Sequence, residues 1–281
     1  MEKRIIGLGV LFGALGGLLA FLFARVLAEP IIDRAIDYEE ARGHAEAELD
    51  RAAGHSVPHV HDAELFTRSV QANTGLGFGV IVFGAAMGAL FAVVYALAVG
   101  RVGRLAPRPL ALLVAGGMFL VVYAVPFLKY PANPPSVGNA DTIEERTGLY
   151  LGTVVLTAVL LFAAIWLGRK LSARLGAWSA TVAAGAAFVV VTGIALALLP
   201  ALGDLSANAA TGTETPQPLT DPTGRIVFPG FPADDLYHFR LYSLAAQAIL
   251  WTIIGVGVAS ATTRLFGREA ARGDTTPAPL V

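Results

Sequence analysis

The sequence predicts an all-α fold, a membrane-spanning bundle of about six transmembrane helices. Composition is the first reason: 55% of the 281 residues are hydrophobic, only 15% are charged, and the mean hydropathy is +0.64. Such values are typical of multispan membrane proteins and not of soluble domains. The second reason is a series of long apolar runs, and the third is the uneven distribution of charge between the segments that connect them.

Six runs are close to the roughly 20 residues that a helix needs to cross about 30 Å of hydrocarbon. They are residues 5–24, 75–99, 109–128, 149–167, 177–199 and 242–262. None of them contains an acidic residue, so each can satisfy its backbone as a helix in the lipid bilayer without burying charge. Glycines recur every four residues at Gly9, Gly13 and Gly17, and again at Gly84 and Gly88, which predicts close helix packing.

Charge orients the bundle. The short connections and the two termini hold eleven of the twenty Lys and Arg residues but only three of the twenty-one acids. By the positive-inside rule these segments face the cytoplasm, which predicts a multi-pass protein of the cell membrane with both termini inside. The whole chain, 1–281, is then one integral membrane domain, and 263–281 is expected to be a disordered cytoplasmic tail.

The first outer loop, 29–74, is the most informative soluble stretch. Residues 28–51 are rich in Ala, Glu and Arg and predict a helix, on which six polar side chains share one arc about 100° wide. They are Glu29, Asp33, Asp37, Glu40, His44 and Glu48. Such a ladder of carboxylates would lead toward the histidine cluster that follows, although an exposed helix carrying solvated charge gives the same pattern.

After Gly54 and Pro58 break the helix, potential metal ligands crowd into eight residues at His55, His59, His61 and Asp62, with His44 nearby. Imidazoles and a carboxylate without thiolates suit a borderline divalent ion such as Co²⁺, Ni²⁺ or Zn²⁺. The chain has no cysteine, so no thiolate site and no disulfide framework is available. A solvated polar linker remains the alternative.

A second candidate metal pair is Asp234 and His238, four residues apart at the start of a helix. At that spacing two side chains can share one ion. An ordinary acid at a helix start beside a partnered histidine is the alternative.

Residues that would form an outer pore mouth lie where spans meet the outer loops. They are Arg68, Gln71, Lys129, Tyr130, Arg146 and Arg240. The recurring arginines are consistent with three repeated helical hairpins, an arrangement that transporters use, and equally with anchoring at lipid headgroups.

Several functions find no support in the sequence. No G-x-x-x-x-G-K-[ST] phosphate loop occurs, no nucleophile–base pair is visible, and no feature points to nucleic acid, so an enzyme is not expected. The spans hold no Asp, Glu or His, which ion-coupled carriers usually need. The spans offer hydroxyls and one amide instead, among them Tyr95, Tyr123, Thr153, Thr157, Ser243 and Gln247.

Segments along nearly the whole chain resemble the predicted cobalt transporter subunit family of the CbtA type. These are EPIIDRAI at 29–36, the His-rich stretch before RSVQ at 68–71, KYPANPP at 129–135 with Val137-Gly138, FPAD at 231–234 and FRLYSL at 239–244. The resemblance implies Co²⁺ uptake in support of cobalamin synthesis, no permanently bound cofactor, and a small single-span partner of the CbtB type with a histidine-rich tail. The family is often described with about five spans, whereas six are counted here.

Two hypotheses follow. In one, the chain is the membrane subunit of a Co²⁺ uptake system, and its outer His/carboxylate loop captures the ion. In the other, it is a non-transporting membrane metal sensor or scaffold that recruits a transporting partner.

Overall fold

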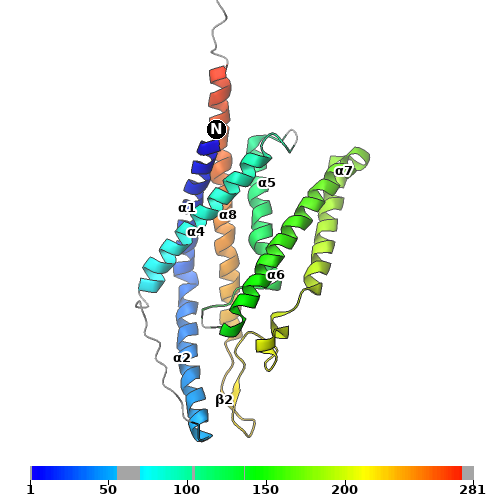
Figure 1. Ribbon diagram of the computed structural model, residues 1–281. Coiled ribbons are helices and arrows are strands. Elements are labelled where there is room, and N and C mark those ends of the chain that lie inside the picture. The colour runs from blue at the N-terminus through cyan, green and yellow to red at the C-terminus, as the bar shows by residue number, and fades with distance from the viewer. Residues whose placement is uncertain (1, 56–69, 103–104, 136, 274–281) are drawn as a thin grey trace, which may run out of the picture. The chain divides into compact units, whose positions relative to one another are not determined.

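The computed structural model describes residues 2–55, 70–102, 105–135 and 137–273 (Figure 1). Nearly all of its regular structure is helical, as predicted. Five helices in this part of the chain are long and apolar enough to cross a membrane, and one of them, within 140–204, holds two of the predicted spans. The residues divide into two compact units.

The first unit comprises Met1–Arg25, Phe66–Phe119 and Ala245–Val281. It contains α1 (Glu2–Leu27) up to Arg25, the short π-helix η1 (Gln71–Gly75), α4 (Leu76–Ala98), α5 (Pro107–Phe119) and the later part of α8 (Ala233–Gly273). The predicted tail, 263–281, begins inside α8, and 274–281 lie outside the described residues.

Glycines bring α1 and α4 into backbone contact, as their four-residue spacing predicts. A Cβ added at Gly88 would fall against the carbonyl oxygen of Gly9 and 2.9 Å from Gly13 Cα. One added at Gly84 would fall against the Gly13 carbonyl oxygen and 2.9 Å from Gly17 Cα. The two backbones therefore touch along about two turns, and any larger residue there would push the helices apart.

The second unit comprises Val26–Leu65 and Leu120–Leu244. Its helices are α2 (Glu29–Ala52), the π-helix η2 (Leu120–Ala124), α6 (Val125–Lys129), α7 (Ile143–Leu198) and the first part of α8, with 3₁₀ turns η3 (Ala140–Thr142), η4 (Leu202–Asp204) and η5 (Ser206–Asn208). The strands β1 (Leu219–Thr220) and β2 (Ile226–Phe228) pair antiparallel in a small hairpin.

Gly176 divides α7 into the two spans predicted there. Its φ of 75° and ψ of 161° lie outside the helical region and are accessible to glycine at little cost. Figure 1 shows the helix doubling back at this turn. The two limbs pack at a small-residue contact, since a Cβ added at Gly168 would lie 3.3 Å from Ala184 Cβ. With α7 counted as two spans, the prediction of about six transmembrane helices is confirmed.

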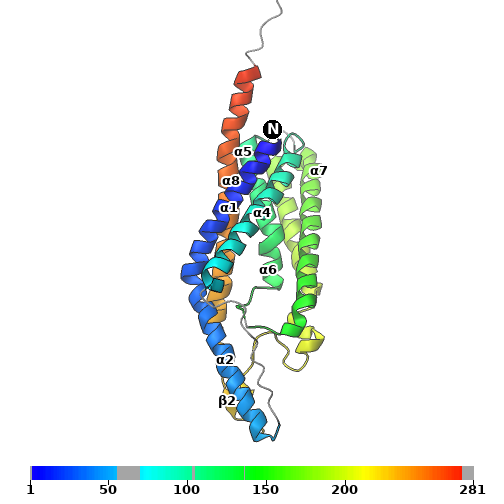
Figure 2. The ribbon, with the colours of Figure 1, turned by 60° about the vertical axis from the view of Figure 1, so that its left-hand side comes forward.

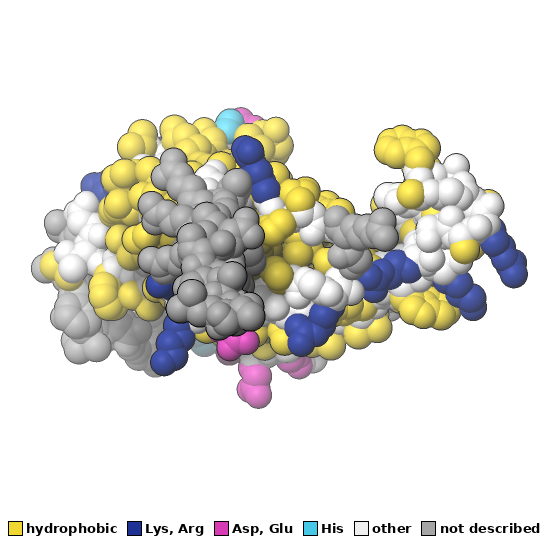
Figure 3. Space-filling view, turned by 90° about the horizontal axis from the view of Figure 1, so that it is seen from above, with side chains coloured by type: hydrophobic (Ala, Val, Ile, Leu, Met, Phe, Trp, Pro, Cys, Tyr) yellow, Lys and Arg dark blue, Asp and Glu magenta, His cyan; other side chains and the backbone are white. Residues whose placement is uncertain are grey.

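The α7 turn is basic and the surface of the helix is apolar. Arg169, Lys170 and Arg174 lie near the turn. The face seen in Figure 3 shows Lys and Arg side chains among hydrophobic ones. Lys170 Nζ lies 4.9 Å from the ring centroid of Trp166. Trp178 is 81% exposed, and so large an exposed apolar surface is suited to lipid.

The opposite end of the second unit, the loop end, consists of α2 and the segments 130–142 and 199–232. α2 and β2 lie side by side in both ribbon views (Figure 2), and residues of the two elements are in contact. The helix predicted over 28–51 is confirmed as α2, which begins after a turn at Ala28 and ends before Gly54, whose φ is 79°. The charge pattern predicts that α2 and the segments 130–142 and 199–232 lie on the same side of the membrane. In the structure all three contribute to one end of this unit. The threefold repeat of hairpins stays a prediction.

Candidate functional site

The predicted histidine cluster is only partly described. His59, His61 and Asp62 lie outside the described residues, as does Arg68. His55 and His44 are both about three-quarters exposed, His55 Nδ1 lies 3.9 Å from Asp50 Oδ1, and His44 Nε2 lies 4.0 Å from Glu40 Oε1. In the parts of the chain that the structure describes, no three His, Asp or Glu side chains are grouped so that they could hold a metal ion.

The second candidate pair makes an ordinary helical contact. His238 Nδ1 lies 2.8 Å from the backbone oxygen of Asp234, one turn earlier in α8. The imidazole ring also packs against Tyr237 and Tyr242, with centroid distances of 5.4 and 5.9 Å. Use of this pair as a metal site stays a prediction.

The polar ladder on α2 faces solvent for most of its length. Glu29 is only 1% exposed, at the start of the helix. The other five members, Asp33, Asp37, Glu40, His44 and Glu48, are exposed. Four carboxylates and an imidazole therefore lie along one open face of α2, which leads toward His55.

The other side of α2 is anchored to the start of α8 and to the segment 199–232. Arg34 donates to both oxygens of Asp235, with Nη2 2.6 Å from Oδ1 and Nε 3.1 Å from each oxygen. These hydrogen bonds raise the pKa of the Arg34 guanidinium above its ordinary value. Arg42 donates to the backbone oxygen of Gln217 at 2.6 Å. The anchors hold the orientation of the helix and hence the direction in which its acidic face points.

An aromatic contact fills the space between these polar anchors. The Tyr38 ring packs edge-on against Phe231, with centroids 5.1 Å apart, and lies 5.4 Å from Phe228. Its hydroxyl donates to the backbone oxygen of Pro229 at 3.0 Å. Ala35 and Val137 complete the buried cluster with Phe231. The segment 228–231 thus packs against α2 through Phe228, Pro229 and Phe231.

We expect replacement of Arg34 by lysine to weaken this anchor by about 0.5–1 kcal/mol, because an ammonium group cannot reproduce the two-pronged contact and the pair is partly solvated. A double-mutant cycle with Asp235→Asn, read from thermal unfolding and from hydrogen exchange of α2 amides, measures the coupling. Arg51→Lys, at the exposed end of α2, is the matched control. A coupling energy near zero would contradict the anchoring role.

Three pore-mouth candidates contact the loops that charge predicts to lie outside the membrane. Tyr130 is buried, its hydroxyl donates to the Pro200 oxygen at 3.0 Å, and burial raises the pKa of this hydroxyl. Arg240 donates to Asn133 Oδ1 at 2.8 Å and to the Ala132 oxygen at 3.3 Å. Arg146 forms an ion pair with Glu214. Lys129 ends α6 and Gln71 begins η1.

A buried carboxylate, Glu214, organises the loop end and was not singled out by the sequence. Its side chain is 5% exposed, and its Oε2 accepts from Arg146 Nη1 at 3.0 Å. Its Oε1 accepts from Asn208 Nδ2 at 2.6 Å and lies 2.8 Å from the Thr142 hydroxyl. Asn139 N completes the set at 3.3 Å from Oε2. One carboxylate thus joins the loop after α6, the start of α7 and the loop after α7.

Nothing local marks Glu214, which lies in a Thr-rich stretch with ordinary loop composition. A buried carboxylate is stable only where charge and hydrogen-bond donors meet it, and three of the four donors here, Asn139, Thr142 and Arg146, come from positions about 70 residues away. Gly138 is the one residue of the sequence that reflects this site indirectly. Its φ is 147°, and a Cβ added there would lie 3.0 Å from Arg146 Nη1, so a side chain at this position would crowd the ion pair.

Most of the predicted span hydroxyls bond to helix backbone. Thr153 donates to the Leu149 oxygen at 2.8 Å, and Thr157 to the Thr153 oxygen at 2.7 Å. Tyr95 donates to the Pro107 oxygen at 2.9 Å. In the second unit, Tyr150 donates to the Val122 oxygen within η2 at 3.0 Å. A π-helix leaves carbonyls available for such contacts, and π-turns often occur at functional positions.

Comparison with known proteins gives one match. The family described as "Probable cobalt transporter subunit (CbtA)" matches residues 2–263, nearly the whole chain. No curated protein and no solved structure matches the chain. With several long apolar helices and a match of this extent, the resemblance noted in the sequence is confirmed: the chain is a multi-pass membrane protein and belongs to the probable cobalt transporter subunit family, CbtA.

Proposed function

We propose that this chain is the membrane-spanning component through which Co²⁺ enters the cell in support of cobalamin synthesis, and that its outer loop captures the ion. Family membership supports the transport role. The observation that carries the capture role is the anchored α2, which holds four carboxylates and His44 on one exposed face. In this proposal the ion passes from that face to the ligands His55, His59, His61 and Asp62. A second metal-binding site is formed by Asp234 and His238.

The physical basis is electrostatic. A row of carboxylates creates a negative potential that raises the local concentration of a divalent cation and increases its rate of arrival. The effect extends about 8–10 Å at physiological salt, so a fixed helix face is more effective than a chain of changing shape. Neutral imidazoles then select a borderline ion such as Co²⁺ over the hard ions Mg²⁺ and Ca²⁺, which prefer oxygen ligands alone.

Further parts of the proposal concern place and partners. The protein is assigned to the cell membrane with both termini in the cytoplasm, on the basis of the basic short connections. Arg68, Gln71, Lys129, Tyr130, Arg146 and Arg240 surround the outer mouth. A small single-span, His-rich subunit of the CbtB type is the proposed partner. The chain itself catalyses no reaction, and Co²⁺ is its cargo.

One observation favours a second candidate function. The six predicted spans contain no Asp, Glu or His, and the Thr153 and Thr157 hydroxyls are hydrogen-bonded to their own helix. A protein that senses metal outside the membrane and recruits a transporting partner needs no ion path of its own.

Uptake of ⁵⁷Co²⁺ into proteoliposomes or cells, with and without the single-span subunit, separates the two functions. We expect the change of His55, His59 and His61 to alanine to raise the half-saturating Co²⁺ concentration at least about tenfold and to leave the maximal rate nearly unchanged. Binding of Co²⁺ by purified protein that supports no uptake in any combination would favour the sensor. Uptake unaffected by the triple change would exclude the histidines as the capture site.

The acidic face has a matched control. The triple variant Asp37→Asn, Glu40→Gln and Glu48→Gln should raise the half-saturating concentration severalfold, most strongly at low ionic strength, because screening weakens the field of the face. The variant Glu39→Gln, Glu144→Gln and Glu145→Gln removes the same charge from exposed positions outside this face. If both variants raise the half-saturating Co²⁺ concentration equally, the net charge of the protein matters and the position of the carboxylates on α2 does not.

A further inference from the structure

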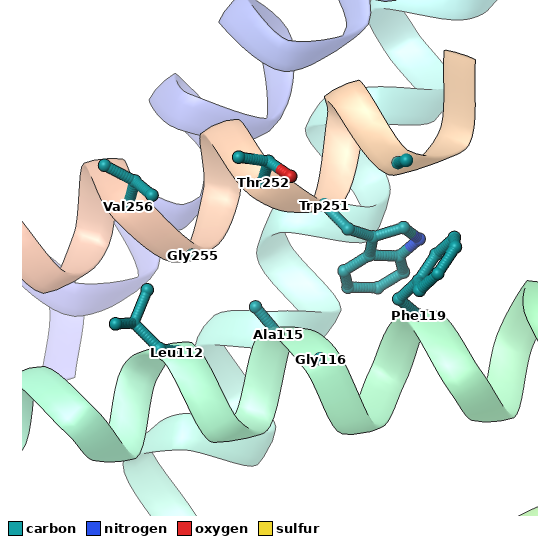
Figure 4. A pocket seen from close by; sticks show the side chains of 9 residues that line it. Leu112, Ala115, Gly116, Phe119, Trp251, Thr252, Gly255 and Val256 are labelled. Atoms are coloured by element: carbon teal, nitrogen blue, oxygen red, sulfur yellow. The ribbon is translucent and has the colours of Figure 1, made fainter. Parts of the chain in front are cut away.

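A groove lies between α5 and α8 of the first unit, within the membrane-spanning segments (Figure 4). Its volume is about 240 Å³. Small residues line much of it, with Gly116 on α5 and Ala248, Thr252 and Gly255 on α8. At its base the two helices are in close contact, since a Cβ added at Gly255 would lie 2.8 Å from Ala115 Cβ.

The groove has the form of a helix-binding surface. On α8 the residues Ala248, Thr252 and Gly255 follow one another at intervals of four and three, so they share one helix face. Gly116 has nothing within 4 Å of the position of an added Cβ, so the space above it is open. Leu112 and Val256, which also line the groove, are about half exposed. The small residues Gly116, Ala248 and Gly255 would allow the backbone of another helix to approach closely.

An unsatisfied donor lies in the same groove. Trp251 is 3% exposed and projects from α8 beside Phe119 (Figure 4). Its indole Nε1 is buried and has no hydrogen-bond partner among the described residues. A buried N–H group without an acceptor is costly, and more so where water cannot reach it.

The depth of this donor restricts what could accept its hydrogen bond. Trp251 is near the middle of the predicted span 242–262, roughly 15 Å from either end at about 1.5 Å per residue. Hydrocarbon tails have no acceptor, and the ester and headgroup oxygens of lipids lie at the edges of a core about 30 Å thick. An acceptor at this depth therefore comes from protein.

We propose that the groove binds one transmembrane helix of a partner subunit, which packs small residues against Gly116 and Ala248. On binding, the Trp251 indole, whose Nε1 is buried in the chain alone, turns toward this helix and donates a hydrogen bond to it near mid-membrane. The family match describes a subunit, which supports an assembly with other chains. The identity of the partner, the single-span subunit, rests on the function proposed above.

Co-expression of tagged chain with the single-span subunit, followed by purification in mild detergent, tests the docking. Gly116→Leu should reduce the amount of retained subunit about tenfold, because the added side chain fills the groove. Trp251→Phe keeps an aromatic ring but removes the N–H, and we expect a loss of about threefold. Gly79→Leu is the matched control, since Gly79 is an exposed glycine of α4 that also has nothing within 4 Å.

Cross-linking gives the second readout. The chain has no cysteine, so Gly116→Cys introduces a unique thiol. It should form a disulfide with a cysteine placed mid-span in the subunit, whereas Gly79→Cys should not. A dominant link between two Gly116→Cys chains, a link within one chain after a second cysteine is added, or full retention of the subunit by Gly116→Leu would each overturn the proposal. Failure of wild-type protein to retain the subunit would also overturn it, and the ⁵⁷Co²⁺ uptake assay decides the transport function separately.

Discussion

Replacement of Gly88 by alanine should destabilise the first unit by about 2–3 kcal/mol, because a single methyl group has no space between α1 and α4. The added Cβ would meet the Gly9 carbonyl oxygen and would lie 2.9 Å from Gly13 Cα. Both obstacles are backbone atoms, so no side-chain rotation relieves the overlap and the helices must separate. Separation would also weaken the neighbouring contact at Gly84.

Thermal unfolding of detergent-solubilised protein, followed by tryptophan fluorescence, measures this effect. We expect the midpoint to fall by about 5–10 °C for Gly88→Ala. Gly79→Ala, on the same helix, should change stability by less than about 0.5 kcal/mol, because its added Cβ would have nothing within 4 Å. Equal midpoints for the two variants would mean that α1 and α4 are not in backbone contact.

Removal of the Glu214 carboxylate should destabilise the second unit by at least as much. Glu214→Ala leaves the Arg146 guanidinium and the Asn208 amide without their acceptor in a buried position. Breaking a buried pair from one side typically costs about 3–5 kcal/mol, and partial exposure of Arg146 should reduce this to about 2–4 kcal/mol. Glu214→Gln keeps the shape and one acceptor oxygen, so its loss should be smaller.

The loss should be local to the loop end. Because Glu214 joins three segments, its removal should expose 199–232 to limited proteolysis and should lower the thermal midpoint. Glu145→Gln is the matched control, since it removes a carboxylate from an exposed position beside Arg146. Comparable proteolysis of Glu145→Gln and Glu214→Ala would contradict the joining role. Co²⁺ uptake by both variants would show whether the outer mouth requires an ordered loop end.

The structure changes the interpretation of three pore-mouth candidates, because it shows them in contact with loop residues. Tyr130, Arg146 and Arg240 were selected because basic and aromatic residues recur where the spans meet the outer loops. In the structure each of them contacts a loop residue: Tyr130 contacts Pro200, Arg146 contacts Glu214 and Arg240 contacts Asn133. Their immediate role is to hold the loops, and any role at a mouth depends on that.

The helices and their packing glycines follow from the sequence alone. Lipid offers no hydrogen bonds to the backbone, so an uninterrupted apolar run near 20 residues has one stable solution, a helix. The four-residue spacing of Gly9, Gly13 and Gly17 likewise predicts that one face of the first helix lacks side chains and can contact another helix closely. The turn at Gly176 also fits, because it lies in the basic interval between two apolar runs.

Only the tertiary structure decided how the polar groups are paired. Glu214 is chemically unremarkable in its own segment, and it becomes a buried centre because Thr142 and Arg146 reach it from another part of the chain. The Arg34–Asp235 pair and the unsatisfied Trp251 N–H likewise cannot be predicted from the sequence around each residue. The physical reason is that apolar burial in a membrane depends on composition and period, which are local properties. Polar pairing depends on which distant residues meet, and a single sequence does not contain that information in readable form.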